Sequence, residues 1–337
     1  MSATPDPAPV LDLLDAFRGS KVLFAAVELG IFDRLQERPS TCAALAQALP
    51  ADPDALERLL SACVYFKLLT RAGDSYVNTP AASTYLCRSS PRRLTGYLNY
   101  SNTVLWNLWQ HLEDAVREGT HRWPQAFGID GPIFSFFFRN EEDKREFLLG
   151  MHGQGQLSSP EVVKAFDLSR FRFLCDLGGA TGHLAIAACR RYQELRAILF
   201  DLPAAGPLAK EMIGATDVAD RIEIVSGDFF TDALPEADLF AVGRILHDWS
   251  EEKIRLLLGK IYNRLPQGGG LLVLEKLLDD DRSGPRWAVL QSLNMLLCTE
   301  GKERTLGEYT SLLRAAGFRT VDGRRTDSPL DAVLAIK

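Results

Sequence analysis

The sequence predicts an α/β protein whose parallel sheet follows a mostly helical, winged-helix-like N-terminal domain. From about residue 171, short apolar runs alternate with helical segments, the pattern of a mostly parallel sheet with helices on both faces. Before that, three short helical segments lead into a hairpin, the order of a winged helix. We expect an N-terminal domain at 1–103 and a second domain at 104–337.

The N-terminal domain is predicted from helical spacing and from capping residues. Apolar residues recur at helical spacing over residues 11–37. Thr41 can cap a short helix, and Asp52 followed by Pro53 can open a third one. A small hairpin turns around Gly73-Asp74. The third helix carries balanced charge, so we favour dimerisation or a substrate lid over DNA binding.

The second domain is expected to consist of a helical linker and lid at 104–170 and a sheet-containing core at 171–337. Helix is predicted at 94–118 and 141–152, on either side of a Gly- and Pro-rich loop at 119–132. The expected strands of the core are 171–177, 196–203, 221–230, 237–246 and 268–278, with a closing hairpin from 318–326 and 331–337. Ligands of such sheets bind at the carboxyl ends of the strands.

Composition restricts the partners of this chain. A net charge of −6 and a pI of about 5.5 argue against a nucleic-acid partner and give no polybasic membrane patch. The longest apolar run, residues 22–32, is interrupted by Glu28 and is too short to span a bilayer. No signal peptide is recognisable, and the six cysteines show neither a CxxC pair nor zinc spacing. We therefore expect a cytoplasmic protein with reduced thiols.

Polar motifs follow the first three strands of the core. The loop CDLGGATGH contains Gly178, where the backbone can pass close to a ligand at a helix N-terminus. Its glycine spacing differs from the dinucleotide fingerprint GxGxxG. Asp201 ends the second strand, where a carboxylate can bind a ribose diol. Asp228 and Phe229 end the third strand, where the carboxylate can accept from an amino group and the ring can face a purine. This set predicts S-adenosylmethionine (SAM) rather than NAD.

The motifs DLGGATG, FDLP, GDFF, RILHDWS and TEGKERT, in that order, resemble the small-molecule O-methyltransferases typified by acetylserotonin O-methyltransferase and the plant caffeate-type enzymes. The likeness is closest to the acetylserotonin O-methyltransferase-like group and covers residues 11–337. It implies a Rossmann-like class I methyltransferase domain, an N-terminal dimerisation domain, a homodimer, and methyl transfer from SAM to a small hydroxylated aromatic acceptor. On this resemblance the residues that hold SAM are Gly178, Asp201, Asp228, Phe229 and Arg244.

The resemblance also assigns catalytic roles. His247 matches the general base of the family, and Glu275 and Glu303 match the acids that flank it. An imidazole with a pKa near ~6.5 suits removal of a proton from a phenol with a pKa of ~10. We expect the neighbouring Asp248 to point elsewhere and to have a supporting role. No His, Asp or Glu spacing along the chain is typical of a metal site, so we expect metal-independent chemistry.

Two positions depart from the family pattern. Ala180 stands where the usual cofactor motif has glycine, and its methyl group could tighten the loop. Cys298 stands where the acetylserotonin enzyme has a second amide, four residues after Asn294. A thiol does not replace an amide's donor and acceptor, which argues against N-acetylserotonin and leaves another phenol or a polyketide-like ring open. The predicted acceptor pocket contains Trp109, Phe138, Met151, Asn294 and Cys298.

Other interpretations of the sequence remain open at this point. A catalytically silent SAM-binding dimer could act as a regulator or sensor, and a nicotinamide-dependent oxidoreductase could use the same sheet.

The other histidines carry weaker expectations. His152 could line the pocket, His183 could cap the helix after the glycine loop, and His111 and His121 resemble surface residues.

Overall fold

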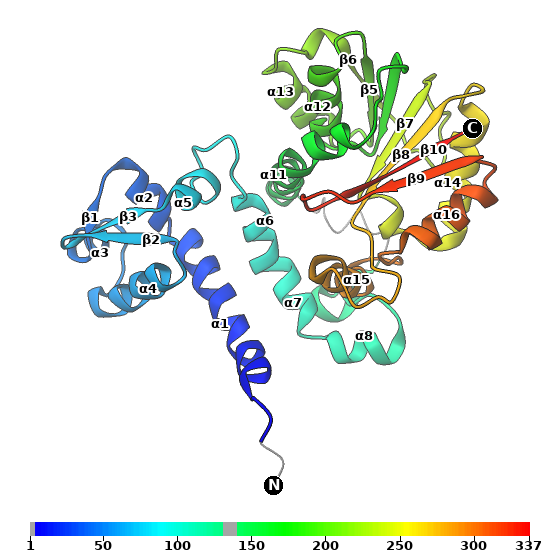
Figure 1. Cartoon of the computed structure of the whole chain (residues 1–337). Coiled ribbons are helices and arrows are strands. Elements are labelled where there is room, and N and C mark those ends of the chain that lie inside the picture. The colour runs from blue at the N-terminus through cyan, green and yellow to red at the C-terminus, as the bar shows by residue number, and fades with distance from the viewer. Residues whose placement is uncertain (1–3, 131–139) are drawn as a thin grey trace. The chain divides into compact units, whose positions relative to one another are not determined.

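The computed structural model describes residues 4–130 and 140–337 (Figure 1). Phe138, predicted to line the acceptor pocket, lies outside these residues. The chain forms two compact units, residues 1–103 and 104–337. No helix within the described ranges is long and apolar enough to cross a membrane.

The N-terminal unit contains a small antiparallel sheet with strand order β1-β3-β2, which helices α2, α3, α4 and α5 contact. The side chains of Thr41 and Asp52 cap helices α3 and α4 as predicted. The helix predicted over 11–37 is instead interrupted at Gly30, whose left-handed φ of 73° ends one helix and starts the next. The elements are α1 (Ala8–Glu28), α2 (Ile31–Glu37), β1 (Ser40–Thr41), α3 (Cys42–Ala48), α4 (Pro53–Tyr65), β2 (Leu69–Ala72), β3 (Ser75–Asn78), α5 (Pro80–Tyr85) and α6 (Thr95–Tyr100).

Helices occupy the start of the second unit. A π-helical turn at Ser101–Leu105 leads into α7 (Trp106–Trp109) and α8 (Leu112–Glu118). The loop expected at 119–132 contains a short helix, α9 (Trp123–Phe127), because Pro124 suits its first turn and Gly128 ends it. The helix predicted at 141–152 continues to residue 165 as α11 (Glu141–Ala165).

The core of the second unit is a seven-stranded sheet with the order β6-β5-β4-β7-β8-β10-β9. The first five strands in this order are parallel, and β10 runs antiparallel between β8 and β9. The strands are β4 (Phe173–Leu177), β5 (Arg196–Asp201), β6 (Ile222–Ser226), β7 (Leu239–Gly243), β8 (Gly270–Glu275), β9 (Thr320–Arg324) and β10 (Asp331–Ile336). The predicted strands are present. β4 ends where predicted but starts two residues later, and the other strands of this sheet end one to four residues before their predicted ends.

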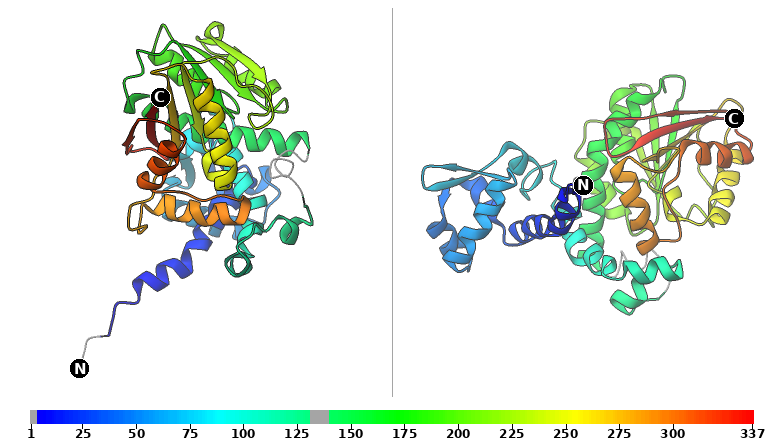
Figure 2. Two further views of the ribbon diagram at one scale, coloured as in Figure 1. Left: turned by 90° about the vertical axis from the view of Figure 1, so that its right-hand side faces the viewer. Right: turned by 60° about the horizontal axis from the view of Figure 1, so that its bottom comes forward.

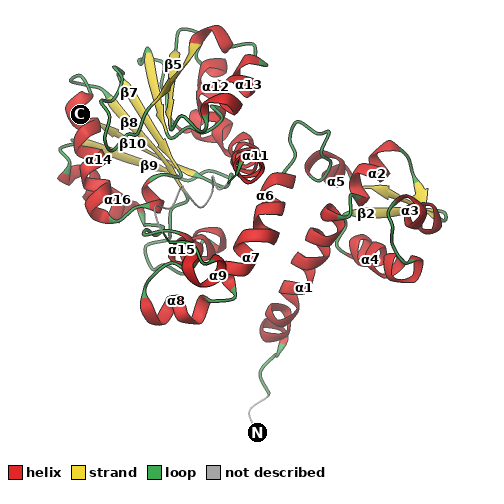
Figure 3. Cartoon of the chain, turned by 180° about the vertical axis from the view of Figure 1, so that it is seen from behind, coloured by secondary structure: helices red, strands yellow, loops and turns green. Residues whose placement is uncertain are grey.

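Helices cover both faces of the sheet, as the alternating pattern predicts. α11, α12 (His183–Arg191) and α13 (Gly206–Gly214) lie on one face, and α14 (Glu251–Arg264) and α16 (Leu306–Ala315) on the other (Figures 1 and 3). Figure 2 shows α14, in yellow, crossing in front of the strands. α15 (Arg286–Cys298) packs against α7 and α8 instead. The predicted motifs therefore follow parallel strands and meet at the carboxyl edge of one sheet.

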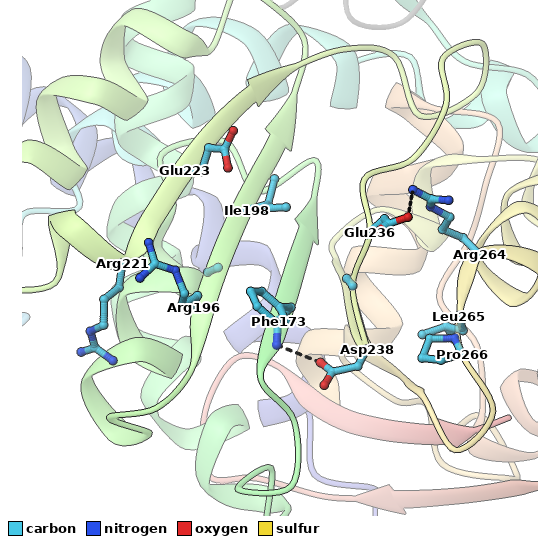
Figure 4. A pocket seen from close by; sticks show the side chains of 12 residues that line it. Phe173, Arg196, Ile198, Arg221, Glu223, Glu236, Asp238, Arg264, Leu265 and Pro266 are labelled. Carbon is cyan, nitrogen blue, oxygen red and sulfur yellow. Dashed lines mark hydrogen bonds and ion pairs between the residues drawn. The ribbon is translucent and has the colours of Figure 1, made fainter.

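A hollow of about 600 Å³ opens at the opposite, amino-terminal edge of the sheet (Figure 4). Several of its charged groups already serve the fold. Asp238 accepts from the backbone N–H groups of Arg172 and Phe173, and Arg264 pairs with Glu236. This hollow is remote from every motif that the sequence singles out, so we do not assign the chemistry to it.

Candidate active site

The glycine loop after β4 is shaped by close contacts. Gly178 has a left-handed φ of 67°, and a Cβ atom there would lie 2.5 Å from Cδ1 of Ile245. A Cβ atom at Gly179 would lie 2.5 Å from a carboxylate oxygen of Asp176. Only glycine fits these positions without displacing a neighbour. The loop ends at the N-terminus of α12, a suitable place for a ligand.

Two carboxylates lie at this loop. Asp201 Oδ2 accepts from the N–H of Ala180 at 2.7 Å, and Oδ1 accepts from the N–H of Leu202 at 2.6 Å. Burial raises the pKa of Asp201 to about 6, although these two hydrogen bonds act to lower it. Burial, together with the charge of Asp201, raises the pKa of Asp176 to about 7. Asp176 Oδ2 has no hydrogen-bond partner within the described residues. A positively charged ligand would favour the charged form of both acids.

The third strand end forms a compact turn. Asp228 Oδ1 accepts from the N–H of Phe230 at 2.8 Å, and the Phe229 and Phe230 rings meet edge to face with centroids 4.8 Å apart. Arg244 follows β7 with a φ of 55°, an uncommon conformation for a long side chain, and its N–H donates to the carbonyl of Leu274. Such backbone strain is typical of functional sites.

Ala180 also has a left-handed conformation, with a φ of 52°. This is the position where the family motif has glycine, and the backbone conformation explains that preference. An L-residue in this region costs ~1–2 kcal/mol, more than the ~0.5–1 kcal/mol entropic cost of glycine. The methyl group packs against the cluster of Leu148, Ala205 and Leu208, which offsets part of the strain.

We expect Ala180→Gly to raise the free energy of unfolding by about 0.5 kcal/mol, because relief of the backbone strain slightly outweighs removal of the packed methyl group. Chemical denaturation with urea measures this change. Ala205→Gly is the matched control, because Ala205 belongs to the same cluster but has a right-handed φ of −81° and should only lose stability. Equal losses of stability in both variants would contradict the strain at Ala180.

The structure brings His247, Glu275 and Glu303 together in a buried cluster. The Nδ1 atom of His247 is 2.7 Å from Glu303 Oε1 and 3.3 Å from Glu275 Oε2. The exposed fractions of these three side chains are 5%, 0% and 1%. Because a carboxylate only accepts, Nδ1 carries the proton and Nε2 is the basic nitrogen. One possible ligand atom from each of these three side chains lies within 4.8 Å of the others, so the group could hold a metal ion. The spacing of these residues along the sequence did not reveal this grouping.

The expectation that Asp248 points away from His247 is wrong. Its Oδ1 atom lies 3.7 Å from Nε2 of His247, on the reactive side of the ring. The reason is local backbone geometry. Residues Leu246–Asp248 form a 3₁₀ turn rather than a strand end, so neighbouring side chains do not alternate between opposite faces.

Charge in this cluster favours the imidazolium form. Burial lowers the pKa of His247, but Glu275, Glu303 and Asp248 outweigh it and raise the pKa to about 10. Burial raises the pKa of Glu275 to about 7, opposed by His247. Glu275 also shapes the turn, because its Oε1 accepts from the N–H groups of Ile245 and Leu246 at 3.1 and 2.9 Å.

The loop that carries Glu303 contains two further residues that sequence reasoning missed. Buried Arg304 donates through Nη1 to the carbonyl of Leu246 at 3.1 Å. A Cβ atom at Gly301 would lie 2.1 Å from the carbonyl oxygen of His247. Only glycine therefore allows this loop to cross so close to the turn that carries His247. Both residues belong to the TEGKERT motif, but the motif does not reveal these roles, because they depend on contacts between distant segments.

We expect Gly301→Ala to lower kcat by about tenfold or more, because a misplacement of ~1 Å at a catalytic group costs up to ~10² in rate. SAM should bind as before. Steady-state kinetics and calorimetry measure the two quantities. Gly307→Ala is the matched control, since a Cβ atom there meets only Thr305 Oγ1 at 3.6 Å. Wild-type kcat in Gly301→Ala would show that the crossing does not position His247.

Three residues that are predicted to line an acceptor pocket, Trp109, Asn294 and Cys298, lie together. Trp109 Nε1 donates to Asn294 Oδ1 at 3.0 Å, and the Cys298 thiol lies 3.8 Å from the same oxygen. An indole N–H can only donate, so the Asn294 oxygen faces Trp109 and its amide N–H₂ points elsewhere. Trp123 Nε1 donates to the carbonyl of Cys298. Met151 is partly buried on α11.

The structure shows the surroundings of the remaining histidines. His152 is buried, with Nδ1 2.8 Å from Thr181 Oγ1, and so joins α11 to the glycine loop. His183 does not cap α12, because Gly182 occupies the cap and Nδ1 of His183 lies 2.9 Å from Ser159 Oγ. His111 and His121 are partly buried rather than on the surface, and burial lowers the pKa of His121.

Comparison with known families and proteins agrees with this architecture. The O-methyltransferase domain family matches residues 109–319, and the O-methyltransferase dimerisation domain family matches residues 11–88. Acetylserotonin O-methyltransferase of Bos taurus is 46% identical, with 96% of this chain and 95% of that protein aligned. The enzyme of Gallus gallus is 42% identical over the full length of both chains.

Comparison with solved structures identifies the same family. Human N-acetylserotonin methyltransferase in complex with SAM matches with a TM-score of 0.93 and 41% identity over 100% of this chain and 99% of that one. PigF with SAH matches with a TM-score of 0.89 and 28% identity over 99% and 100%. The predicted family, fold class, enzyme class and cofactor are confirmed, and the dimerisation domain supports a homodimer. The chain therefore belongs to the acetylserotonin O-methyltransferase-like family of SAM-dependent O-methyltransferases.

Proposed function

We propose that this enzyme transfers the methyl group of SAM to a hydroxyl of a small aromatic acceptor, without a metal ion and with His247 as general base. The observation that carries this proposal is the buried His247 side chain, whose Nδ1–H donates to Glu303 and leaves Nε2 to take a proton. A phenol with a pKa of ~10 is mostly protonated at neutral pH, so a base at its oxygen makes it a better nucleophile.

The carboxyl edge of the sheet fits the cofactor. A glycine loop that excludes side chains, the Asp176 oxygen without a partner and the Asp201 carboxylate together favour a cationic, ribose-containing ligand. SAM supplies the electrophilic methyl group when bound. The residues proposed to hold it are Gly178, Asp201, Asp228, Phe229 and Arg244.

The proposed base works within a defined set of charges. Glu303 holds the ring orientation and the tautomer, and Glu275 fixes the backbone immediately before the histidine. The acceptor O–H gives its proton to Nε2 as the oxygen attacks, and the carboxylates stabilise the imidazolium that forms.

For the acceptor we propose a hydroxyindole or a related phenol. The relatives of 41–46% identity are named as acetylserotonin O-methyltransferases, and Trp109, Asn294 and Cys298 form a partly apolar, partly amide-bearing group. Because Cys298 cannot offer the paired donor and acceptor of an amide, we expect weaker selection for the N-acetyl side chain than for the ring hydroxyl.

A panel of acceptors tests this function. Purified protein is incubated with methyl-labelled SAM and a hydroxyindole, a catechol or a polyketide-like phenol, and products are mapped by mass spectrometry. Each acceptor is paired with its analogue lacking the hydroxyl. We expect an O-methyl product only from hydroxylated compounds. Methylation of nitrogen or carbon, or of the analogues without hydroxyl, would contradict the proposal.

The charges around His247 predict a shift in the pH dependence. Since its pKa lies well above the ordinary value, kcat/KM of the wild type should rise with pH through the neutral range. Glu303→Gln removes a negative charge that favours the imidazolium, so the pKa of His247 falls and the rise occurs at lower pH. Glu300→Gln is the control, since Glu300 pairs with Lys253. Identical pH profiles for the wild type and Glu303→Gln would exclude this coupling.

A further inference from the structure

A single ammonium group binds the backbone of the turn after β6. Lys260 lies on α14, and its Nζ donates to three carbonyl oxygens, those of Phe229 at 2.7 Å, Phe230 at 2.9 Å and Asp232 at 2.8 Å. An ammonium group has three N–H donors and no acceptor. This one turn therefore uses the whole hydrogen-bonding capacity of the side chain.

The N–H groups of the same turn are bound internally. Asp228 Oδ1 accepts from the N–H of Phe230, and Asp232 Oδ2 accepts from the N–H of Asp228 at 2.9 Å. The carbonyl of Asp228 accepts from the N–H groups of Thr231 and Asp232. The N–H groups of residues 228, 230, 231 and 232 are thus satisfied within the turn, whereas the carbonyls of residues 229, 230 and 232 converge on Lys260. Loss of that charge would remove three charge-assisted hydrogen bonds at once.

This turn lies directly beside the glycine loop. A Cβ atom at Gly178 would be 3.5 Å from Cε1 of Phe229, so the Phe229 ring borders the place where the loop approaches a ligand. The next ring of the turn, Phe230, packs edge to face against Trp249, with the two ring centroids 5.0 Å apart. A shift of the carbonyls would therefore move the Phe229 ring and the Asp228 carboxylate relative to the glycine loop.

We propose that Lys260 is a positioning residue for the cofactor, which holds Asp228 and Phe229 in the geometry that receives the adenosine part of SAM. This role rests on the proposed function, in which those two residues hold SAM. The role of Lys260 concerns cofactor affinity and not methyl transfer, because its ammonium group contacts the turn after β6 rather than the cluster around His247. A group that aids the ground state and the transition state equally changes KM and leaves kcat unchanged.

Lys260→Met tests this role. We expect the dissociation constant for S-adenosylhomocysteine, measured by calorimetry, and the KM for SAM each to rise about tenfold. The kcat at saturating SAM and the KM for the acceptor should stay within about twofold of the wild type. Lys260→Arg should recover part of the affinity, because a guanidinium group has several donors for the same carbonyls.

Lys337→Met is the matched control. The Lys337 ammonium donates to the carbonyls of Tyr262 and Leu265, both at 2.7 Å, near the end of the same helix and away from the turn. This variant should lose thermal stability and keep wild-type affinity for S-adenosylhomocysteine. Equal affinities in Lys337→Met and Lys260→Met, or a fall in kcat with unchanged KM for SAM in Lys260→Met, would overturn the role.

Two further outcomes separate the role of Lys260 from the proposed function. If the wild type binds no S-adenosylhomocysteine, the proposed function fails and the role fails with it. If the wild type and Lys260→Met bind it equally, only the role of Lys260 fails. Should Lys260→Met not fold, Lys260→Gln replaces it, with an expected affinity below that of the wild type, because an amide has two N–H donors and no charge. Wild-type affinity in Lys260→Gln would then overturn the role.

Discussion

His247→Ala should lower kcat by about 10²–10⁴-fold, the usual contribution of a general base. The imidazole is the group whose Nε2 is oriented to take the acceptor proton, because Nδ1 is held by Glu303 at 2.7 Å. Without it the phenol O–H has no imidazole nitrogen beside it to take its proton. Cofactor binding should change little, because the hydrogen bonds of Asp201 and Asp228 belong to other strand ends. Steady-state kinetics with calorimetry of S-adenosylhomocysteine measures both effects.

His111→Ala is a suitable control for this variant. His111 is a partly buried histidine at the start of α8, and its replacement should leave kcat and affinity near wild type. An unchanged kcat in His247→Ala would remove the histidine from the mechanism. A parallel loss of cofactor affinity would instead show that the 3₁₀ turn supports the glycine loop.

Asp201→Asn should weaken binding of S-adenosylhomocysteine by about 10–100-fold, since removing hydrogen bonds to a charged group costs ~1.5–3 kcal/mol. The carboxylate accepts from the N–H groups of Ala180 and Leu202, and so fixes the glycine loop as well as its own position. An amide in its place directs an N–H₂ group at one of these donors. Calorimetric titration at neutral pH measures the change.

The surface residue Asp217 provides the control for Asp201. It pairs with Arg190 at 2.7 Å, and both side chains are largely exposed. Asp217→Asn should therefore bind S-adenosylhomocysteine as the wild type does, because an exposed pair contributes little. Equal affinities for the wild type, Asp201→Asn and Asp217→Asn would show that the strand end after β5 is not the ribose site.

The sequence was sufficient to predict which polar motifs share one edge of the sheet. Apolar runs locate the strands, and parallel strands bring their carboxyl ends to one edge, so Gly178, Asp201 and Asp228 had to be neighbours. The ordered motifs identified the family. The carboxyl ends of the strands other than β4 were placed too late, because residues such as Leu246 are apolar and buried although they lie in a turn.

Other features depend on contacts that no local pattern encodes. Glu275 and Glu303 are 28 and 56 residues from His247 and meet it only because β7, β8 and a later loop converge. Gly301 is an ordinary loop glycine until its neighbour, the His247 carbonyl, is known. Lys260 looks like a solvated helix residue, and the three carbonyls that it binds lie about 30 residues earlier.

A crystal structure with S-adenosylhomocysteine and an acceptor identified by the panel would test the central claim most directly. The quantity to measure is the distance from the acceptor hydroxyl oxygen to Nε2 of His247. We expect about 2.6–3.2 Å, the range of a hydrogen bond to a general base, with no metal ion between them. A hydroxyl oxygen placed against another side chain, or bound to a metal ion, would contradict the mechanism.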